Sequence, residues 1–202
     1  MTHAPERFDF DVIAGWIRPG ERVLDLGCGD GSLLRHLRDT RQVLGYGVEL
    51  SPANVLACVK MGINVLQSDL ERGLSGFESG GFDHVIMSLS LQAVHNTERL
   101  LREMLRVGRE AAVSFPNFGY HSHRAAIAAG RMPVSKALPY RWYDSPNVRF
   151  FTIADFEDLC AAMKISILEC HAFDESAMRV RDNPNLNASI ALYRLGRTAP
   201  AA

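Results

Sequence analysis

Three glycines occupy alternate positions in the stretch GCGDG, at Gly27, Gly29 and Gly31. The stretch follows an apolar run that contains Asp25, and glycine permits a positive φ and lacks a Cβ. A ligand can therefore approach the peptide groups of this loop, as ligands do beyond the carboxyl ends of strands in open parallel sheets. A tight turn that binds no ligand is the alternative that this motif alone leaves open.

Two further carboxylates favour a ligand. Glu49 ends the next apolar run along the chain, and Asp69 ends the one after it. A carboxylate at the first of these positions can accept both hydroxyls of a ribose. A carboxylate at the second can accept the exocyclic amine of adenine. Each acid alone is more typical of a solvated strand end, but three of them beside one glycine loop indicate a nucleoside site.

The residues around the loop narrow the choice of nucleoside. The spacing is G-x-G-x-G, the stretch lacks the lysine that phosphate loops use, and two acidic residues, Asp25 and Asp30, are nearby. Such surroundings disfavour a pyrophosphate and suit a cofactor that carries an amine and a sulfonium. We therefore predict S-adenosylmethionine, with adenine at Asp69, ribose at Glu49 and the methionine portion along residues 25–31.

Alternating apolar and helical stretches must position these residues. Near-continuous apolar strands separated by helices indicate a parallel sheet covered on both faces. Two later apolar runs predict an antiparallel pair at one edge, and the whole chain, 1–202, is predicted to form one α/β domain. The expected strands are 22–27, 42–50, 63–69, 82–91, 109–116, 165–173 and 187–197, and the expected helices are 32–39, 52–61, 97–107 and 152–164.

Capping signals support two of the helices. Ser51 is the expected N-cap of the second helix, with Pro52 at its first position and Gly62 just beyond its end. Thr152 and Asp155 have the spacing of a capping box.

Composition excludes several functional classes. The net charge of −1 argues against a protein that holds nucleic acid by bulk electrostatics. Charges interrupt the N-terminal apolar stretch, so it predicts neither a signal peptide nor a membrane span. The cysteines have no metal-site spacing, and His121 and His123 have no third ligand at a recognisable spacing, so we predict no metal. Free thiols, as in a reducing cytosol, are expected at Cys28, Cys58, Cys160 and Cys170. The protein is therefore expected to be cytoplasmic.

Candidates for catalysis follow the fourth strand, in SLSLQAVHN. This stretch lacks the N-P-P-Y or D-P-P-Y clamp associated with amino-group methylation of bases. Gln92 and His95 are its available polar groups, and a histidine can act as a general base near neutral pH. The alternative for His95 is a surface histidine at the start of a helix.

Residues 117–150 interrupt the alternation of strands and helices and are rich in aromatic residues, histidine and arginine. Such a segment can form a lid over an acceptor pocket or a surface for another protein, where Tyr, Trp and Arg often dominate binding. Packing against the core is the alternative. The aromatic residues concerned are Tyr140, Trp142, Tyr143, Phe150 and Phe151.

The motifs VLDLGCGDG, GVELS and QSDLE resemble the successive cofactor motifs of class I S-adenosylmethionine-dependent methyltransferases. The resemblance implies a Rossmann-like sheet of seven strands, mostly parallel with an antiparallel last strand, and helices on both faces. It also adds neighbouring residues to the candidate cofactor set, namely Cys28, Leu50, Leu70 and Ser88.

Together with GCGDGSLL and SLSLQAVHN, the long segment 117–150 resembles the MetW family of methionine biosynthesis proteins. That resemblance implies a partner, a homoserine O-acyltransferase of the MetX type, whose acylation of homoserine this chain would support or regulate. The alternative is an S-adenosylmethionine-dependent methyltransferase that acts on an unidentified small molecule.

Overall fold

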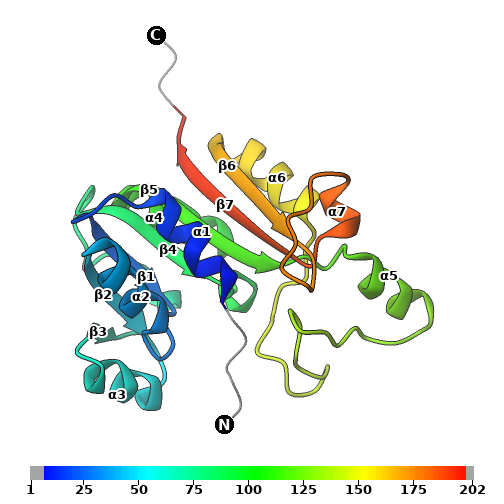
Figure 1. The fold of residues 1–202 in the computed structure, drawn as a ribbon, viewed down its shortest axis with the longest axis horizontal. Coiled ribbons are helices and arrows are strands. Elements are labelled where there is room, and N and C mark those ends of the chain that lie inside the picture. Colours follow the sequence, from blue (N-terminus) through cyan, green and yellow to red (C-terminus); the bar gives the residue numbers. More distant parts are fainter. Residues whose placement is uncertain (1–6, 199–202) are drawn as a thin grey trace.

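The computed structural model describes residues 7–198, and its strands form one seven-stranded sheet (Figure 1). The strands are β1 (Arg22–Leu26), β2 (Leu44–Glu49), β3 (Asn64–Gln67), β4 (Phe82–Ser88), β5 (Gly108–Pro116), β6 (Ile165–Phe173) and β7 (Ile190–Arg197). Their order across the sheet is β3-β2-β1-β4-β5-β7-β6. Strands β1 to β5 are mutually parallel, whereas β7 runs antiparallel to both β5 and β6. The predicted Rossmann-like class I methyltransferase fold is therefore confirmed.

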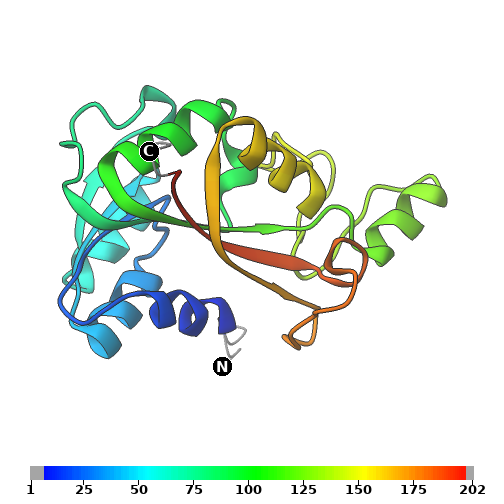
Figure 2. The ribbon, with the colours of Figure 1, turned by 90° about the horizontal axis from the view of Figure 1, so that it is seen from above.

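Helices cover both faces of the sheet (Figure 2). The first buried cluster joins α1 and α2 to the sheet through Ile13, Leu34 and Leu37, and the second joins α4 and α6 through Met104 and Phe156. None of the helices within residues 7–198 is both long enough and apolar enough to cross a membrane. The helices are α1 (Phe8–Trp16), α2 (Ser32–Arg41), α3 (Pro52–Lys60), α4 (Thr97–Val107), α5 (His121–Ala128), α6 (Ile153–Ala162) and α7 (Pro184–Asn187), with single 3₁₀ turns η1 (Leu70–Arg72) and η2 (Leu91–Ala93).

The switch in strand order fixes where a ligand can bind. Strand β1 lies between β2 and β4, and the chain leaves β1 for β2 on one side and later returns to β4 on the other. The crevice of such a sheet opens beyond the carboxyl ends of these strands. The glycine loop, the end of β2 and the end of β4 all lie at that edge.

The predicted helix boundaries hold in most respects. Pro52 begins α3, and Gly62, with φ +69°, lies just beyond the end of this helix, as predicted. The Ser51 side chain, however, makes no capping hydrogen bond to the residues of α3. Thr152 and Asp155 form the predicted capping box, in which the Asp155 carboxylate accepts the Thr152 N–H at 2.8 Å.

Three strand boundaries and two helices differ from the sequence prediction. Strand β4 ends at Ser88 because the chain turns into η2, and β7 begins only at Ile190 because the short helix α7 precedes it. Strand β3 ends at Gln67, which leaves Asp69 two residues beyond it. Helices α1 and α5 were not predicted, and α5 lies within the segment expected to be irregular.

Candidate cofactor site

The three loop glycines all have positive φ, but they serve different purposes. A Cβ on Gly27 would lie 3.3 Å from Ser90 Oγ, and a Cβ on Gly31 would lie 3.0 Å from Cys58 Sγ. A Cβ on Gly29, where φ is +56°, would meet nothing within 4 Å. Gly31 is therefore needed for packing, whereas Gly29 faces open space where a ligand can approach.

Asp25 lies at the carboxyl end of β1, directly before the loop, and is only 2% exposed. Its carboxyl group has no hydrogen bond to any of residues 7–198. Burial raises the pKa of Asp25 to about 7; the Arg7 guanidinium opposes this shift, while Glu49 and Asp9 add to it. A buried, unbonded carboxyl at this position is suited to receive an ammonium group.

Glu49 ends β2 and connects that strand to the glycine loop. One carboxylate oxygen, Oε2, accepts the Gly29 N–H at 2.8 Å. The other, Oε1, accepts the N–H groups of Leu50 at 2.9 Å and Ser51 at 2.8 Å. A ribose that uses both oxygens must share or replace these bonds. The Leu50 side chain is exposed beside this carboxylate.

Asp69 caps the turn η1 rather than ending β3. Its Oδ1 accepts the Glu71 N–H at 2.9 Å, and within the described part of the chain Oδ2 has no partner. One oxygen thus remains able to accept an amine. The neighbouring Leu70 is half-buried and packs against the core.

Sequence reasoning missed a polar network beside the loop. Ser88 Oγ, at the end of β4, donates to Asp9 Oδ2 at 3.0 Å and accepts from Arg7 Nη2 at 3.1 Å. Arg7 also donates through Nε and Nη2 to the two oxygens of Asp9, which is 2% exposed. The one signal in the sequence is the pair of opposite charges, Arg7 and Asp9, at the start of the N-terminal apolar stretch. This network brings a cation to the acidic site.

The Cys28 side chain packs inside the protein, against Cys58 and Gly47. Its Sγ lies 3.9 Å from Cys58 Sγ, and a Cβ on Gly47 would collide with it. Burial raises the pKa of the Cys28 thiol, so the thiol stays protonated.

The two catalytic candidates are in different environments. Gln92 is buried in η2, where its Nε2 donates to the Leu89 carbonyl oxygen at 2.7 Å and its Oε1 has no partner among residues 7–198. His95 is exposed, and its backbone N–H donates to Glu71 Oε1 at 2.6 Å. Within the described residues the imidazole has no hydrogen bond, so nothing orients it as a base.

The start of segment 117–150 is anchored by Asn117, which is fully buried. Its Nδ2 donates to the carbonyl oxygens of Pro184, Asn185 and Ala188, and its Oδ1 accepts the Gly119 N–H at 2.9 Å. His123 is also buried, with hydrogen bonds to the Asn117 carbonyl oxygen and to Ser135 Oγ. Residues 7–198 contain no group of His, Cys, Asp or Glu that could hold a metal ion.

The five aromatic residues singled out in the sequence, at positions 140–151, divide into two groups. Phe151 packs against Phe115, with a ring separation of 4.7 Å, as core packing requires. The other four are exposed, and Trp142 reaches 76%. The exposed residues are Tyr140, Trp142, Tyr143 and Phe150.

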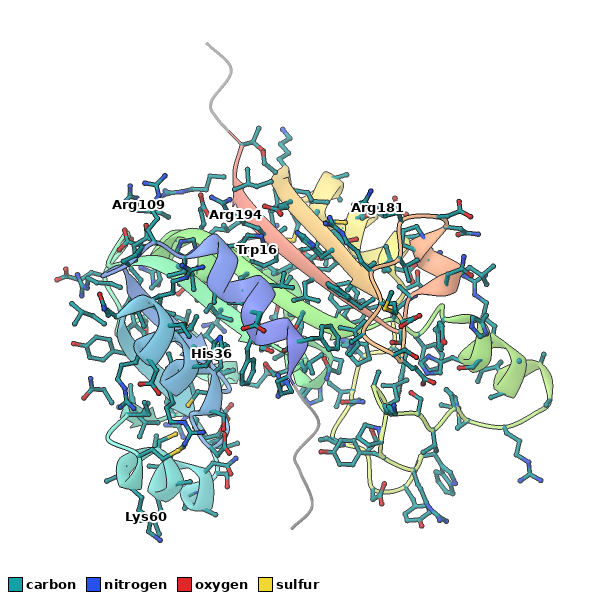
Figure 3. All side chains as sticks on the ribbon, in the orientation of Figure 1. Trp16, His36, Lys60, Arg109, Arg181 and Arg194 are labelled. Atoms are coloured by element: carbon teal, nitrogen blue, oxygen red, sulfur yellow. The ribbon has the colours of Figure 1, made fainter. Side chains whose placement is uncertain are left out.

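A second group of charges lies at the opposite, amino-terminal end of β1, β4 and β5, around the labelled residues Trp16, Arg109 and Arg194 (Figure 3). It encloses a cavity of about 100 Å³. Its acidic residues already have basic partners, so the group stabilises the fold rather than forming a ligand site. The pairs are Arg194–Glu110, Arg109–Asp83 and His84–Glu21.

Solved structures with the same fold include an S-adenosylmethionine-dependent methyltransferase from Mesorhizobium loti. It is 21% identical, with a TM-score of 0.70, and the match covers 96% of this chain and 99% of the other. The [4+2]-cyclase SpnF is 16% identical, with a TM-score of 0.69 and coverage of 96% and 82%. At these identities the likeness establishes the fold alone.

Sequence comparison goes further. The model of the family described as "Methionine biosynthesis protein MetW" matches residues 7–195. The bifunctional methionine biosynthesis protein MetXA/MetW of Rhodopirellula baltica is 41% identical over an alignment of 202 positions, which covers 94% of this chain. The match covers 32% of that relative, so this chain spans about a third of its length. The chain belongs to the MetW family of methionine biosynthesis proteins.

Proposed function

We propose that this chain binds S-adenosylmethionine at the glycine loop and acts with a MetX-type homoserine O-acyltransferase to support or regulate homoserine acylation. Asp25 is the observation that carries the cofactor part of the proposal. A buried carboxyl without a hydrogen bond is costly, and a cationic ligand group removes that cost.

The donor set fits the cofactor group by group. Asp25 suits the ammonium of the methionine portion, Glu49 suits the ribose hydroxyls, and the free oxygen of Asp69 suits the adenine amine. Leu50 offers an apolar side chain, 61% exposed, beside the place proposed for the base. When bound, S-adenosylmethionine supplies a sulfonium and a transferable methyl group.

The partner part of the proposal rests on the fused relative and on segment 117–150. In Rhodopirellula baltica the names MetXA and MetW belong to one polypeptide, which supports an association of the two proteins. The four exposed aromatic residues of segment 117–150 are of the types that dominate protein interfaces. We therefore assign partner contact to this segment, and a lid over an acceptor pocket is its alternative role.

One observation favours the second candidate function, a small-molecule methyltransferase. A cavity of about 490 Å³ lies beside Asp9 and Leu89, next to the proposed cofactor site, and has room for an acceptor. Gln92 is an amide and cannot act as a base, and no hydrogen bond to any of residues 7–198 orients the His95 imidazole, so the regulatory function remains our conclusion.

The test is homoserine acylation by a MetX-type enzyme, with and without this protein, across a titration of S-adenosylmethionine. A rate that requires this protein supports the helper function, and a rate that also follows the cofactor concentration makes the chain a sensor. If the rate is indifferent to this protein and a labelled methyl group is transferred instead, the chain is a methyltransferase.

A further inference from the structure

The cavity of about 490 Å³ has walls from four parts of the chain. They are the start of α1, the end of β4, the stretch after α5, and the connection between β6 and β7. Its volume is in the usual range for small-molecule sites. The cofactor proposal uses none of its far wall, which contains Lys136, Glu175 and Ile190.

Charges of both signs line the cavity. Within residues 7–198, Lys136 Nζ has one hydrogen bond, a long one of 3.4 Å to the backbone oxygen of Glu175. The Glu175 carboxylate has neither a hydrogen bond nor an ion pair to any of residues 7–198. Arg7 pairs with Asp9, and its Nη1 remains unused within the same part of the chain. A cation and a carboxylate with unused hydrogen-bonding capacity thus face the same space.

The backbone around this cavity is strained. Leu89 has φ +52° and Ala177 has φ +61°, and both line the cavity. Left-handed conformations are unfavourable for residues other than glycine, and they cluster at functional sites. Phe8, Leu89 and Ile190 add apolar surface for a short side chain.

We propose that this cavity binds a free α-amino acid, with the ligand carboxylate at Lys136 and Arg7 and its ammonium at Glu175. A phosphate or other dianion would meet the carboxylates of Asp174 and Glu175, and a polyamine would meet both cations. A zwitterion with a short side chain matches the mixture of charged and apolar walls. That this cavity lies beside a bound cofactor rests on the proposed function. The choice of an amino acid as its ligand rests only on the residues that line the cavity.

The test is calorimetric titration with homoserine and with two analogues that each lack one charge, 3-aminopropan-1-ol and 4-hydroxybutyrate. Homoserine is titrated into the protein alone and into the protein after addition of S-adenosylhomocysteine, and the titration of S-adenosylhomocysteine itself is recorded separately. We expect homoserine to bind and each analogue to bind at least about tenfold more weakly, because each loses a charged hydrogen bond. Lys136→Met and Glu175→Gln should each weaken homoserine binding by a similar factor.

Matched controls are Lys60→Met, on α3, a helix that contributes no residue to the cavity walls, and Glu78→Gln, which is exposed (Figure 3 labels Lys60). Neither control should change the affinity. Absence of homoserine binding, equal binding of the analogues, or displacement of homoserine by S-adenosylhomocysteine would overturn the inference. If homoserine binds as expected but S-adenosylhomocysteine does not, the cavity assignment stands and the cofactor proposal fails.

Discussion

At the scale of single residues, the site depends on the carboxyl group of Asp25, which the fold buries without a hydrogen bond to any of residues 7–198. Burial raises the pKa of Asp25 to about 7, so the group titrates near neutral pH. Glu49 presents the opposite case, because three backbone N–H groups already occupy its carboxylate. The cofactor is expected to bind Asp25 directly and to compete with the glycine loop for Glu49.

Cofactor affinity should therefore rise between about pH 6 and pH 8. Only the ionised carboxylate of Asp25 attracts an ammonium, and the ionised fraction increases across this range. Asp25→Asn should bind more weakly and show a flatter profile. Calorimetric titrations at several pH values test this, and a variant that keeps the wild-type slope would show that another group is responsible.

The same shift predicts how Asp25 affects stability. Because its folded-state pKa lies above the unfolded value, the folded protein holds the proton more tightly. The contribution of Asp25 is therefore most favourable below about pH 4 and is lost as pH rises to about 7. Asp25→Asn should gain thermal stability relative to wild type at about pH 8 and not at about pH 4. A difference in melting temperature that does not change with pH would contradict the assignment.

Gly29→Ala and Gly31→Ala form a matched pair. At Gly29 the added Cβ enters open space, so only the left-handed backbone opposes it, at about 1 kcal/mol. At Gly31 the Cβ also presses on Cys58 and Ile63, so the loss of stability should be larger. Gly29→Ala should lower the affinity for the cofactor by more than its small loss of stability explains. Urea unfolding measures the stability of both variants, and calorimetric titration measures their cofactor affinity. If Gly29→Ala keeps the wild-type affinity, the loop does not face the ligand.

At the scale of elements, the glycine loop, the alternation of strands and helices and the α6 capping box could be predicted, because each depends on nearby residues. Helix α5 and the role of Asn117 could not, because Asn117 binds groups more than 60 positions away. The same holds for Asp9, whose contact with Ser88 requires α1 to pack on β4.

Asn117→Ala should cost at least about 3 kcal/mol of unfolding free energy, because it leaves several buried backbone groups unbonded. Asn64→Ala, at an exposed position on β3, is the control and should cost less than about 1 kcal/mol. Urea denaturation measures both. Similar losses for the two variants would show that Asn117 does not anchor the segment.

Arg141→Ala and Trp142→Ala should leave stability and cofactor affinity unchanged, because both side chains are exposed. Affinity for the acyltransferase should fall by about tenfold or more. Tyr46→Ala, at an exposed aromatic on β2, is the control. If the variants lose cofactor binding and keep the partner, the segment is a lid.

At the scale of the whole molecule, the turn after β4 touches both proposed sites. Ser90 packs against Gly27 of the loop, and the Gln92 carbonyl oxygen accepts the N–H groups of Val148 and Arg149. The partner segment and the cofactor loop therefore contact the same short stretch of chain. The resemblance of the motifs indicated both sites, but only the folded structure reveals their connection.

If the two sites are coupled, the cofactor and the acyltransferase should change each other's affinity by the same factor. Arg149→Ala removes the 2.6 Å bond from Nη2 to the His95 carbonyl oxygen and should reduce that factor. Partner affinity measured with and without S-adenosylmethionine tests this. Equal affinities in the wild-type protein would show that the sites are independent.

The most direct measurement is calorimetric titration of S-adenosylmethionine into the wild-type protein and into Glu49→Ala, with folding of both checked by circular dichroism. We predict one binding site in the wild-type protein and an affinity at least about tenfold lower in the variant. No binding to the wild-type protein, or equal binding to a folded Glu49→Ala, would contradict the proposed cofactor site.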